Sequence, residues 1–276
     1  MSYRGLHGLP LTSGKMYSAL SHDDVSAVVE LLREEYPRAR LMACGVSLGG
    51  LLLGGHLAAA DTALSCALLL AAPLDVPRGA ANVEIGALNA AMSRHMAARL
   101  VAAAARHSAR LAADWARVLA ARSVRQFDAA LTAPALGLAS PDHYYAAASL
   151  RPRLHAVRVP TLAVCAADDP FQPLHVLPVR EAASSANIAL MICSRGGHVG
   201  LVDAAGRFLP RLLADYFGAM LRRPAPPPPP RAAAPAPRAR YLSRAEVLAD
   251  AELLAAAPRD YDDYAADYDP YDDAAS

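Results

Sequence analysis

Apolar residues occur along the first 220 positions either in short unbroken runs or in stripes at helical spacing, and the two patterns alternate. The run over residues 63–72 is short and lacks alternation with polar residues, which is typical of a strand buried in a parallel sheet. Strands that alternate with helices predict a doubly wound α/β sheet. The predicted strands cover residues 41–44, 63–72, 161–167 and 188–193.

Two amphipathic helices are predicted beside these strands. The first begins at Ser21, because a serine followed three residues later by Asp24 resembles a capping box. Its apolar stripe ends near Tyr36 and Pro37, where the proline stops a helix. The second helix runs over residues 208–221, so a helix is expected at each end of the sheet-forming region.

The segment of about residues 76–153 has a different pattern, with long stretches rich in Ala, Leu and Arg. It predicts helices over Val83–Leu111 and Trp115–Leu131. Because the segment is inserted between two predicted strands, it has two interpretations of nearly equal weight. It is either a lid over an active site or a set of ordinary crossover helices.

Residues 223–276 have the composition of a disordered tail. Pro226–Pro230 is an unbroken proline run, which favours an extended helix without internal hydrogen bonds. The end of the chain repeats Asp and Tyr and has too little aliphatic surface to fold, although residues 243–256 could form one isolated helix. Arg223 with Pro226 and Pro229 matches the spacing of an SH3-type ligand; a solvated linker is the favoured interpretation.

Composition limits the classes of partner and site. The formal net charge of +1 over 276 residues gives no electrostatic reason to expect nucleic acid. The four cysteines lie in apolar runs without a C-x-x-C spacing, which predicts reduced core residues of an intracellular chain. The chain opens on polar residues, so no signal peptide is expected.

The stretch Leu41–Ala60 carries the strongest motif, G-x-S-x-G, between an apolar run and a second apolar run with small residues. A serine on this strand-to-helix turn lies in strained backbone, and the flanking glycines let strand and helix pack closely. Ser47 is therefore the candidate nucleophile. The backbone N–H of Leu48 is expected to face the carbonyl under attack as the oxyanion donor.

The same twenty residues contain no Asp, Glu, Lys or Arg, so a transmembrane helix is an alternative interpretation. Five glycines in the window argue against one continuous helix, because each costs about 1 kcal/mol relative to alanine in a helix interior. His56 and Asp61 match an H-x-x-x-x-D acyltransferase spacing, but they come after the turn, so this alternative has little weight.

A nucleophilic serine needs a base and an acid that orients the base, and these follow the serine in hydrolase sheets in the order acid, then His. Asp169 follows the strand at 161–167, and His198 follows the strand at 188–193 within a glycine-rich loop. The carboxyl ends of parallel strands share one edge of a sheet. Ser47, Asp169 and His198 are therefore predicted to meet, with Asp168 held in reserve as the acid.

At these residues the chain resembles the α/β-hydrolase-domain family of lipases and phospholipases, which includes YheT-type esterases and the animal abhydrolase-domain phospholipases. The resemblance covers Tyr3 to about Met220 and implies a partial α/β-hydrolase domain over residues 1–222. It rests on YRGLHG with LTSGKMYSA, YPRARLMACGVSLGG, SVRQFDAALTAPALG with DHYYAAAS, PTLAVCAADDPFQP and SRGGHVGLVD.

The resemblance implies a serine esterase or lipase that hydrolyses acylglycerol or phospholipid esters through an acyl-enzyme, with phospholipase A1-like specificity as one expectation. By motif, the family's nucleophile, acid and base fall on Ser47, Asp169 and His198. No metal or organic cofactor is implied. The expected substrate is a lipid ester, and the expected location is cytoplasmic or at a membrane surface.

The chain departs from the family at its start, because family members begin well before the segment that matches Tyr3. The family's membrane-anchor region, first strands and second oxyanion donor are expected to be missing. Loss of one oxyanion donor costs about a hundred- to a thousand-fold in rate, and the strand before Ser47 becomes an unpaired edge. The alternative function is therefore a catalytically impaired isoform that acts as a binding or regulatory protein.

Overall fold

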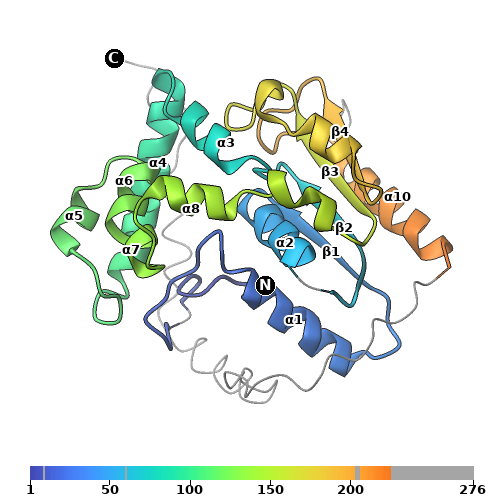
Figure 1. The fold of residues 1–276 in the computed structure, drawn as a ribbon, viewed down its shortest axis with the longest axis horizontal. Coiled ribbons are helices and arrows are strands. Elements are labelled where there is room, and N and C mark those ends of the chain that lie inside the picture. Colours follow the sequence, from blue (N-terminus) through green and yellow to red (C-terminus); the bar gives the residue numbers. More distant parts are fainter. Residues whose placement is uncertain (9, 60, 203–205, 225–276) are drawn as a thin grey trace. The chain divides into compact units, whose positions relative to one another are not determined.

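A computed structural model describes residues 1–8, 10–59, 61–202 and 206–224 (Figure 1). All of them belong to one compact unit, residues 1–229. The predicted tail from residue 225 onward, including its proline run, its Asp- and Tyr-rich end and the prolines of the SH3-type spacing, lies outside the described residues.

Within the described residues, four parallel strands form one sheet in the order β1-β2-β3-β4. They are β1 (Leu41–Val46), β2 (Leu64–Leu70), β3 (Thr161–Ala166) and β4 (Ile188–Cys193). Each predicted strand is present at nearly its predicted position. The parallel sheet carries helices on both faces, as the doubly wound α/β class predicted from the sequence requires.

Alternate residues of β2 pack toward opposite faces of the sheet, as the two-residue period of a strand requires. On one face, α1 (His22–Glu35) and α2 (Leu48–Ala59) contribute Val29 and Leu53 to a core with Leu69. On the other face, α10 (Phe208–Arg222) packs against Leu68 and its neighbours. Figure 1 shows α1 and α2 on the side of the sheet opposite α10.

The strand β1 lies at one end of the sheet and pairs within the described residues with β2 alone. An end position was expected for this strand. Cys44 and Val46 are accordingly exposed. The prediction that all four cysteines are core residues is therefore wrong for Cys44, because its strand lacks a neighbour on one side. All four thiols are free.

The helical segment between β2 and β3 is built from shorter pieces than the sequence predicted. The helix expected at Val83–Leu111 is present only as α4 (Ala87–Ala105), because Gly86 in left-handed backbone precedes it. The helix expected at Trp115–Leu131 is divided into three shorter helices. One break occurs at Ser123, because its side chain accepts a hydrogen bond from the N–H of Gln126 and so caps the start of a new helix. Neither long helix is formed as predicted.

The pieces of this segment form a core of their own around Val118, Phe127 and Leu131. Within the segment are α3 (Val76–Val83), α4, α5 (Trp115–Ala120), α6 (Val124–Phe127), the π-helix η1 (Asp128–Thr132), α7 (Ala133–Ala135), α8 (Pro141–Ala148) and the 3₁₀ helix η2 (Arg151–Ala156). The 3₁₀ helix η3 (Leu174–Val176) and α9 (Val179–Ala183) lie between β3 and β4. Whether the segment acts as a lid stays a prediction.

The start of α1 also differs in detail from its prediction. Ser21 precedes the helix, but its hydroxyl makes no capping bond to the helix and instead accepts the N–H of Ser18 at 3.0 Å. Asp24, the other expected member of the box, accepts hydrogen bonds from the Arg4 guanidinium. The capping box is therefore wrong, because both side chains bind the N-terminal loop that crosses the helix start.

Candidate active site

Ser47 lies on the turn between β1 and α2 with a φ of 51°, a left-handed conformation that non-glycine residues rarely adopt. Close packing explains the glycines around it. A Cβ on Gly45 would come within 2.4 Å of the Gly49 carbonyl oxygen, and one on Gly50 within 2.7 Å of the Ala72 Cβ. The strained turn therefore presents the serine hydroxyl at the carboxyl end of the sheet.

A continuous pair of hydrogen bonds joins three side chains from three loops. The Ser47 Oγ lies 2.8 Å from the Nε2 of His198, and the Nδ1 of His198 lies 2.8 Å from the Oδ2 of Asp169. The structure thus brings together the three residues that the sequence predicted to meet. This geometry allows the imidazole to take a proton from the hydroxyl while the carboxylate fixes its orientation.

The two neighbouring aspartates have different surroundings, which separates the predicted acid from its reserve. Asp169 is only 1% exposed, and its Oδ1 accepts the N–H groups of Phe171 at 2.8 Å and Gln172 at 3.3 Å. Asp168 is exposed and accepts the N–H of Gly197 at 2.9 Å. Only Asp169 contacts the imidazole, and Asp168 instead holds the loop that carries it.

The loop after β4 needs its glycines to bring His198 back over the sheet. Gly196 and Gly197 have φ values of 154° and 55°, and a Cβ on Gly196 would lie 2.2 Å from a methyl carbon of Leu201. The Phe171 ring meets the His198 ring edge-on, with centroids 4.8 Å apart. Phe171 was not predicted from the sequence, because an aromatic residue after an Asp-Pro turn carries no signal of its own.

Leu48 is the first residue of α2, immediately after Ser47. The first N–H groups of a helix have no carbonyl partner within the helix. The Leu48 N–H is therefore available at a helix N-terminus, where a developing negative charge is also favoured by the helix dipole.

Two sequence alternatives are wrong. The window 41–60 is not a single membrane helix, because it folds as strand, turn and helix, and no helix among the described residues is long and apolar enough to cross a membrane. His56 is no acyltransferase residue, because it is buried between the Ser26 and Thr62 hydroxyls, each 2.7 Å from a ring nitrogen. Burial lowers the pKa of its imidazole.

A scan of the chain against protein-family models finds no match. Curated relatives are found. The human protein named phospholipase ABHD3 is 29% identical over 236 residues, which are 79% of this chain and 55% of that protein. The putative esterase YheT of Escherichia coli is 31% identical over 208 residues, which are 73% of this chain and 61% of YheT.

The monoacylglycerol lipase of Saccharomyces cerevisiae is 28% identical over 215 residues, or 74% of this chain and 48% of the lipase. The chain belongs to the α/β-hydrolase family of lipases and esterases. It spans about half the length of the curated relatives it matches.

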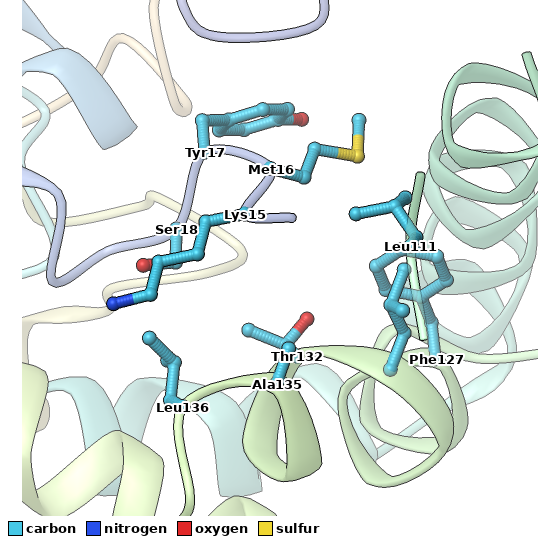
Figure 2. Close-up of a pocket in the computed structure, with 10 residues that line it drawn as sticks. Lys15, Met16, Tyr17, Ser18, Leu111, Phe127, Thr132, Ala135 and Leu136 are labelled. Atoms are coloured by element: carbon cyan, nitrogen blue, oxygen red, sulfur yellow. The ribbon is translucent and has the colours of Figure 1, made fainter. Parts of the chain in front are cut away.

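In this α/β-hydrolase chain a small cavity lies between the N-terminal loop and the helical segment (Figure 2). Its volume is about 30 Å³, enough for one or two water molecules. The lining residues are Lys15, Met16, Tyr17, Ser18, Leu111, Phe127, Leu131, Thr132, Ala135 and Leu136. None of the three hydrogen-bonded site residues lines it, so the cavity is not the place where Ser47 would meet an acyl chain.

The described part of this α/β-hydrolase chain contains no cluster of three or more His, Cys, Asp or Glu side chains that could hold a metal ion. The thiol nearest the acid in sequence, that of Cys165, is buried in β3. Burial raises the pKa of this thiol to about 12, with a smaller contribution from the charge of Asp169. It is therefore a structural core residue rather than a nucleophile.

Proposed function

We propose that this chain is a serine hydrolase of carboxylic esters, with acylglycerol or phospholipid esters as its substrates. The observation that carries the proposal is the hydrogen-bonded series from Ser47 through His198 to Asp169 on a strained strand-to-helix turn. A purely structural role would not require a half-buried serine hydroxyl to be held in left-handed backbone at the edge of a sheet.

In the proposed mechanism, the Nε2 of His198 removes the Ser47 proton as the hydroxyl oxygen attacks the ester carbonyl. Asp169 keeps the imidazole in the correct tautomer and stabilises the imidazolium. The carbonyl oxygen becomes an oxyanion that the Leu48 N–H binds. The imidazolium then protonates the leaving alcohol, and an acyl-enzyme on Ser47 remains.

Water completes the cycle. His198 removes a proton from a water molecule that attacks the acyl-enzyme, and the Ser47 oxygen leaves and recovers that proton from the imidazolium. The products are a carboxylic acid and the alcohol part of the ester. The catalytic roles of Ser47, His198 and Asp169 are part of this proposal.

The lipid nature of the substrate is supported by the names of two relatives, a phospholipase and a monoacylglycerol lipase. Exposed apolar side chains near the site also support it. Val199 follows His198 and is 49% exposed, and Leu174 follows the acid turn and is 51% exposed. We propose that these side chains meet the ester at a lipid surface, where their exposure is favourable.

Nothing among the described residues favours the alternative of a binding protein without activity. That alternative draws on the expected loss of the first strands and of a second oxyanion donor, whereas the hydrogen-bonded series of Ser47, His198 and Asp169 supports the proposed esterase.

Hydrolysis of three substrates tests the proposal: p-nitrophenyl butyrate in solution, monoacylglycerol micelles and phosphatidylcholine vesicles, with carboxylic acid release as the readout. The wild-type chain is expected to hydrolyse at least one of them, and Ser47→Ala is expected to lower that rate by about 10⁴-fold or more. Ser184→Ala, which alters an exposed serine at the end of α9, is the control and should leave the rate unchanged. A wild-type rate equal to that of Ser47→Ala on all three substrates would contradict the proposal.

A further inference from the structure

Two asparagine side chains from the helical segment converge on one backbone carbonyl of the acid turn. The Nδ2 of Asn82, near the end of α3, donates to the Pro170 carbonyl oxygen, and the Nδ2 of Asn89, in the first turn of α4, donates to the same oxygen at 3.2 Å. A carbonyl oxygen has two lone pairs, so it can accept both. Asn89 also donates to the Asn82 carbonyl at 3.0 Å, which ties the two helices together at this point.

The Pro170 carbonyl belongs to the same peptide unit as the N–H of Phe171. A peptide unit is planar and, when trans, directs its carbonyl and its N–H to opposite sides; no peptide bond among the described residues is cis. That N–H donates to the Asp169 Oδ1 at 2.8 Å, while the other carboxylate oxygen binds His198. One rigid plane therefore lies between the two asparagine amides and the Asp169 carboxylate.

A second contact joins α3 to the same turn. Gln172, whose N–H also donates to Asp169, has a side chain that is 3% exposed and packs directly on the backbone of Gly79. A Cβ at Gly79 would overlap the Gln172 amide. The turn that holds Asp169 is thus fixed by α3 through a side-chain packing contact as well as by the two asparagine amides.

We propose that Asn82 and Asn89 are positioning residues for catalysis: they hold the Pro170–Phe171 peptide plane so that its N–H orients the Asp169 carboxylate toward His198. This inference rests on the proposed esterase function. Hydrogen bonds to the carbonyl also polarise the peptide and strengthen its N–H as a donor. The helical segment between β2 and β3 therefore takes part in the site, although none of its residues touches Ser47 or His198 in the described hydrogen bonds.

Variants that keep the branched shape of the side chain and delete the amide donor test the inference. Asn82→Leu and Asn89→Leu are compared with wild type on p-nitrophenyl butyrate. Each is expected to lower kcat by about ten- to a hundred-fold with KM changed less than about two-fold, because a small misplacement of the acid affects the transition state more than binding. The double variant is expected to lose little more than the worse single variant, because both amides act through one carbonyl.

The control is Asn187→Leu. The Asn187 amide likewise donates to a backbone carbonyl, that of Val157 at 3.0 Å, in a loop that does not include a site residue. Its thermal unfolding midpoint is expected to fall as in the other two variants, while its kcat is unchanged. Equal kcat in wild type and in both Asn82→Leu and Asn89→Leu would overturn the inference, as would an equal fall in kcat in Asn187→Leu.

A measurement without turnover separates this inference from the proposed function. The low-field proton resonance of the His198 Nδ1–H, assigned by its loss in His198→Ala, reports the bond to Asp169 whether or not the chain is active. It is expected in wild type and in Asn187→Leu, and is expected to weaken or disappear in Asn82→Leu. An unchanged resonance in Asn82→Leu would overturn the inference. If the resonance weakens in Asn82→Leu but not in Asn187→Leu, and the wild-type chain hydrolyses no ester, then the esterase function alone is rejected.

Discussion

Asp168 and Asp169 are adjacent residues with the same side chain, yet they bind different partners. Asp169 is enclosed and contacts the imidazole through one oxygen and two backbone N–H groups through the other. Asp168 lies on the surface and binds the N–H of Gly197. The sequence alone could not decide which of the two aspartates binds His198. The geometry of one turn places Asp169 against the imidazole and Asp168 against the loop backbone.

This difference predicts unequal effects of the same substitution. Asp169→Asn is expected to lower kcat/KM for p-nitrophenyl butyrate by about 10⁴-fold, because an amide favours the wrong imidazole tautomer. Asp168→Asn keeps an acceptor oxygen for Gly197 and is expected to lower it by less than about tenfold. Equal losses in the two variants, measured with the folded fraction checked by circular dichroism, would contradict the assignment of Asp169 as the acid.

The sequence was informative for the residues that lie at strand ends. Ser47, Asp169 and His198 follow β1, β3 and β4, so their meeting was predictable from strand order and from the rule that parallel strands end at one edge. Asn82 and Asn89 were not predicted, because they lie on helices whose packing is set by tertiary contacts. Their one signal was a weak one: asparagine is unfavourable in helix interiors, so its presence there points to a hydrogen bond elsewhere.

At the level of elements, the glycines of α2 lower the helix propensity of this segment, but they allow α2 to pack closely against its neighbours. Gly50 lies in α2, where a Cβ would be 2.7 Å from the Ala72 Cβ, while Gly218 lies in α10, where a Cβ would meet only the end of the Arg222 side chain at 3.6 Å. The same residue type is therefore required in one helix and replaceable in the other.

Alanine at the two positions is expected to change stability in opposite directions. Gly50→Ala should lower the free energy of unfolding by about 1–3 kcal/mol through overpacking against Ala72, which follows β2. Gly218→Ala should raise it by up to about 1 kcal/mol, because alanine is the better helix former. Urea denaturation followed by circular dichroism measures both, and a stabilised Gly50→Ala variant would contradict the packing account of the turn.

Element boundaries were predictable where a strong local signal exists and not elsewhere. All four strands were located from apolar runs, and the end of α1 from Pro37. The long helices expected in the segment between β2 and β3 failed, because repeated alanine and leucine give helical spacing whether or not Gly86 and Ser123 interrupt the chain. The expected capping box failed because the N-terminal loop offered Asp24 a stronger partner in Arg4.

At the scale of the whole molecule, the helical segment contains a buried carboxyl group that the proposed chemistry does not use. Asp128, in the π-helix η1, accepts a hydrogen bond from the Tyr145 hydroxyl at 2.8 Å. Burial raises the pKa of Asp128 from 3.8 to about 6 despite this donor. Because the folded protein holds this proton more tightly than the unfolded chain, the proton contributes stability below about pH 4 that is lost as the pH rises through 6.

The difference in unfolding free energy between Asp128→Asn and wild type isolates this contribution, because the titration of other groups cancels. Relative to wild type, the unfolding free energy of Asp128→Asn is expected to rise by about 2 kcal/mol from about pH 4.5 to about pH 7. Urea denaturation at several pH values measures it. A pH-independent difference would contradict the buried state of the Asp128 carboxyl.

The central claim, that the Ser47 hydroxyl is a nucleophile activated by His198, is tested most directly by covalent labelling. The chain is treated with a fluorophosphonate probe, and the labelled residue is identified by mass spectrometry of peptides. The account predicts one phosphonylated residue, Ser47, with labelling abolished in Ser47→Ala and slowed by at least about a thousand-fold in His198→Ala. A folded wild-type chain that stays unlabelled, or that is labelled equally in His198→Ala, would contradict it.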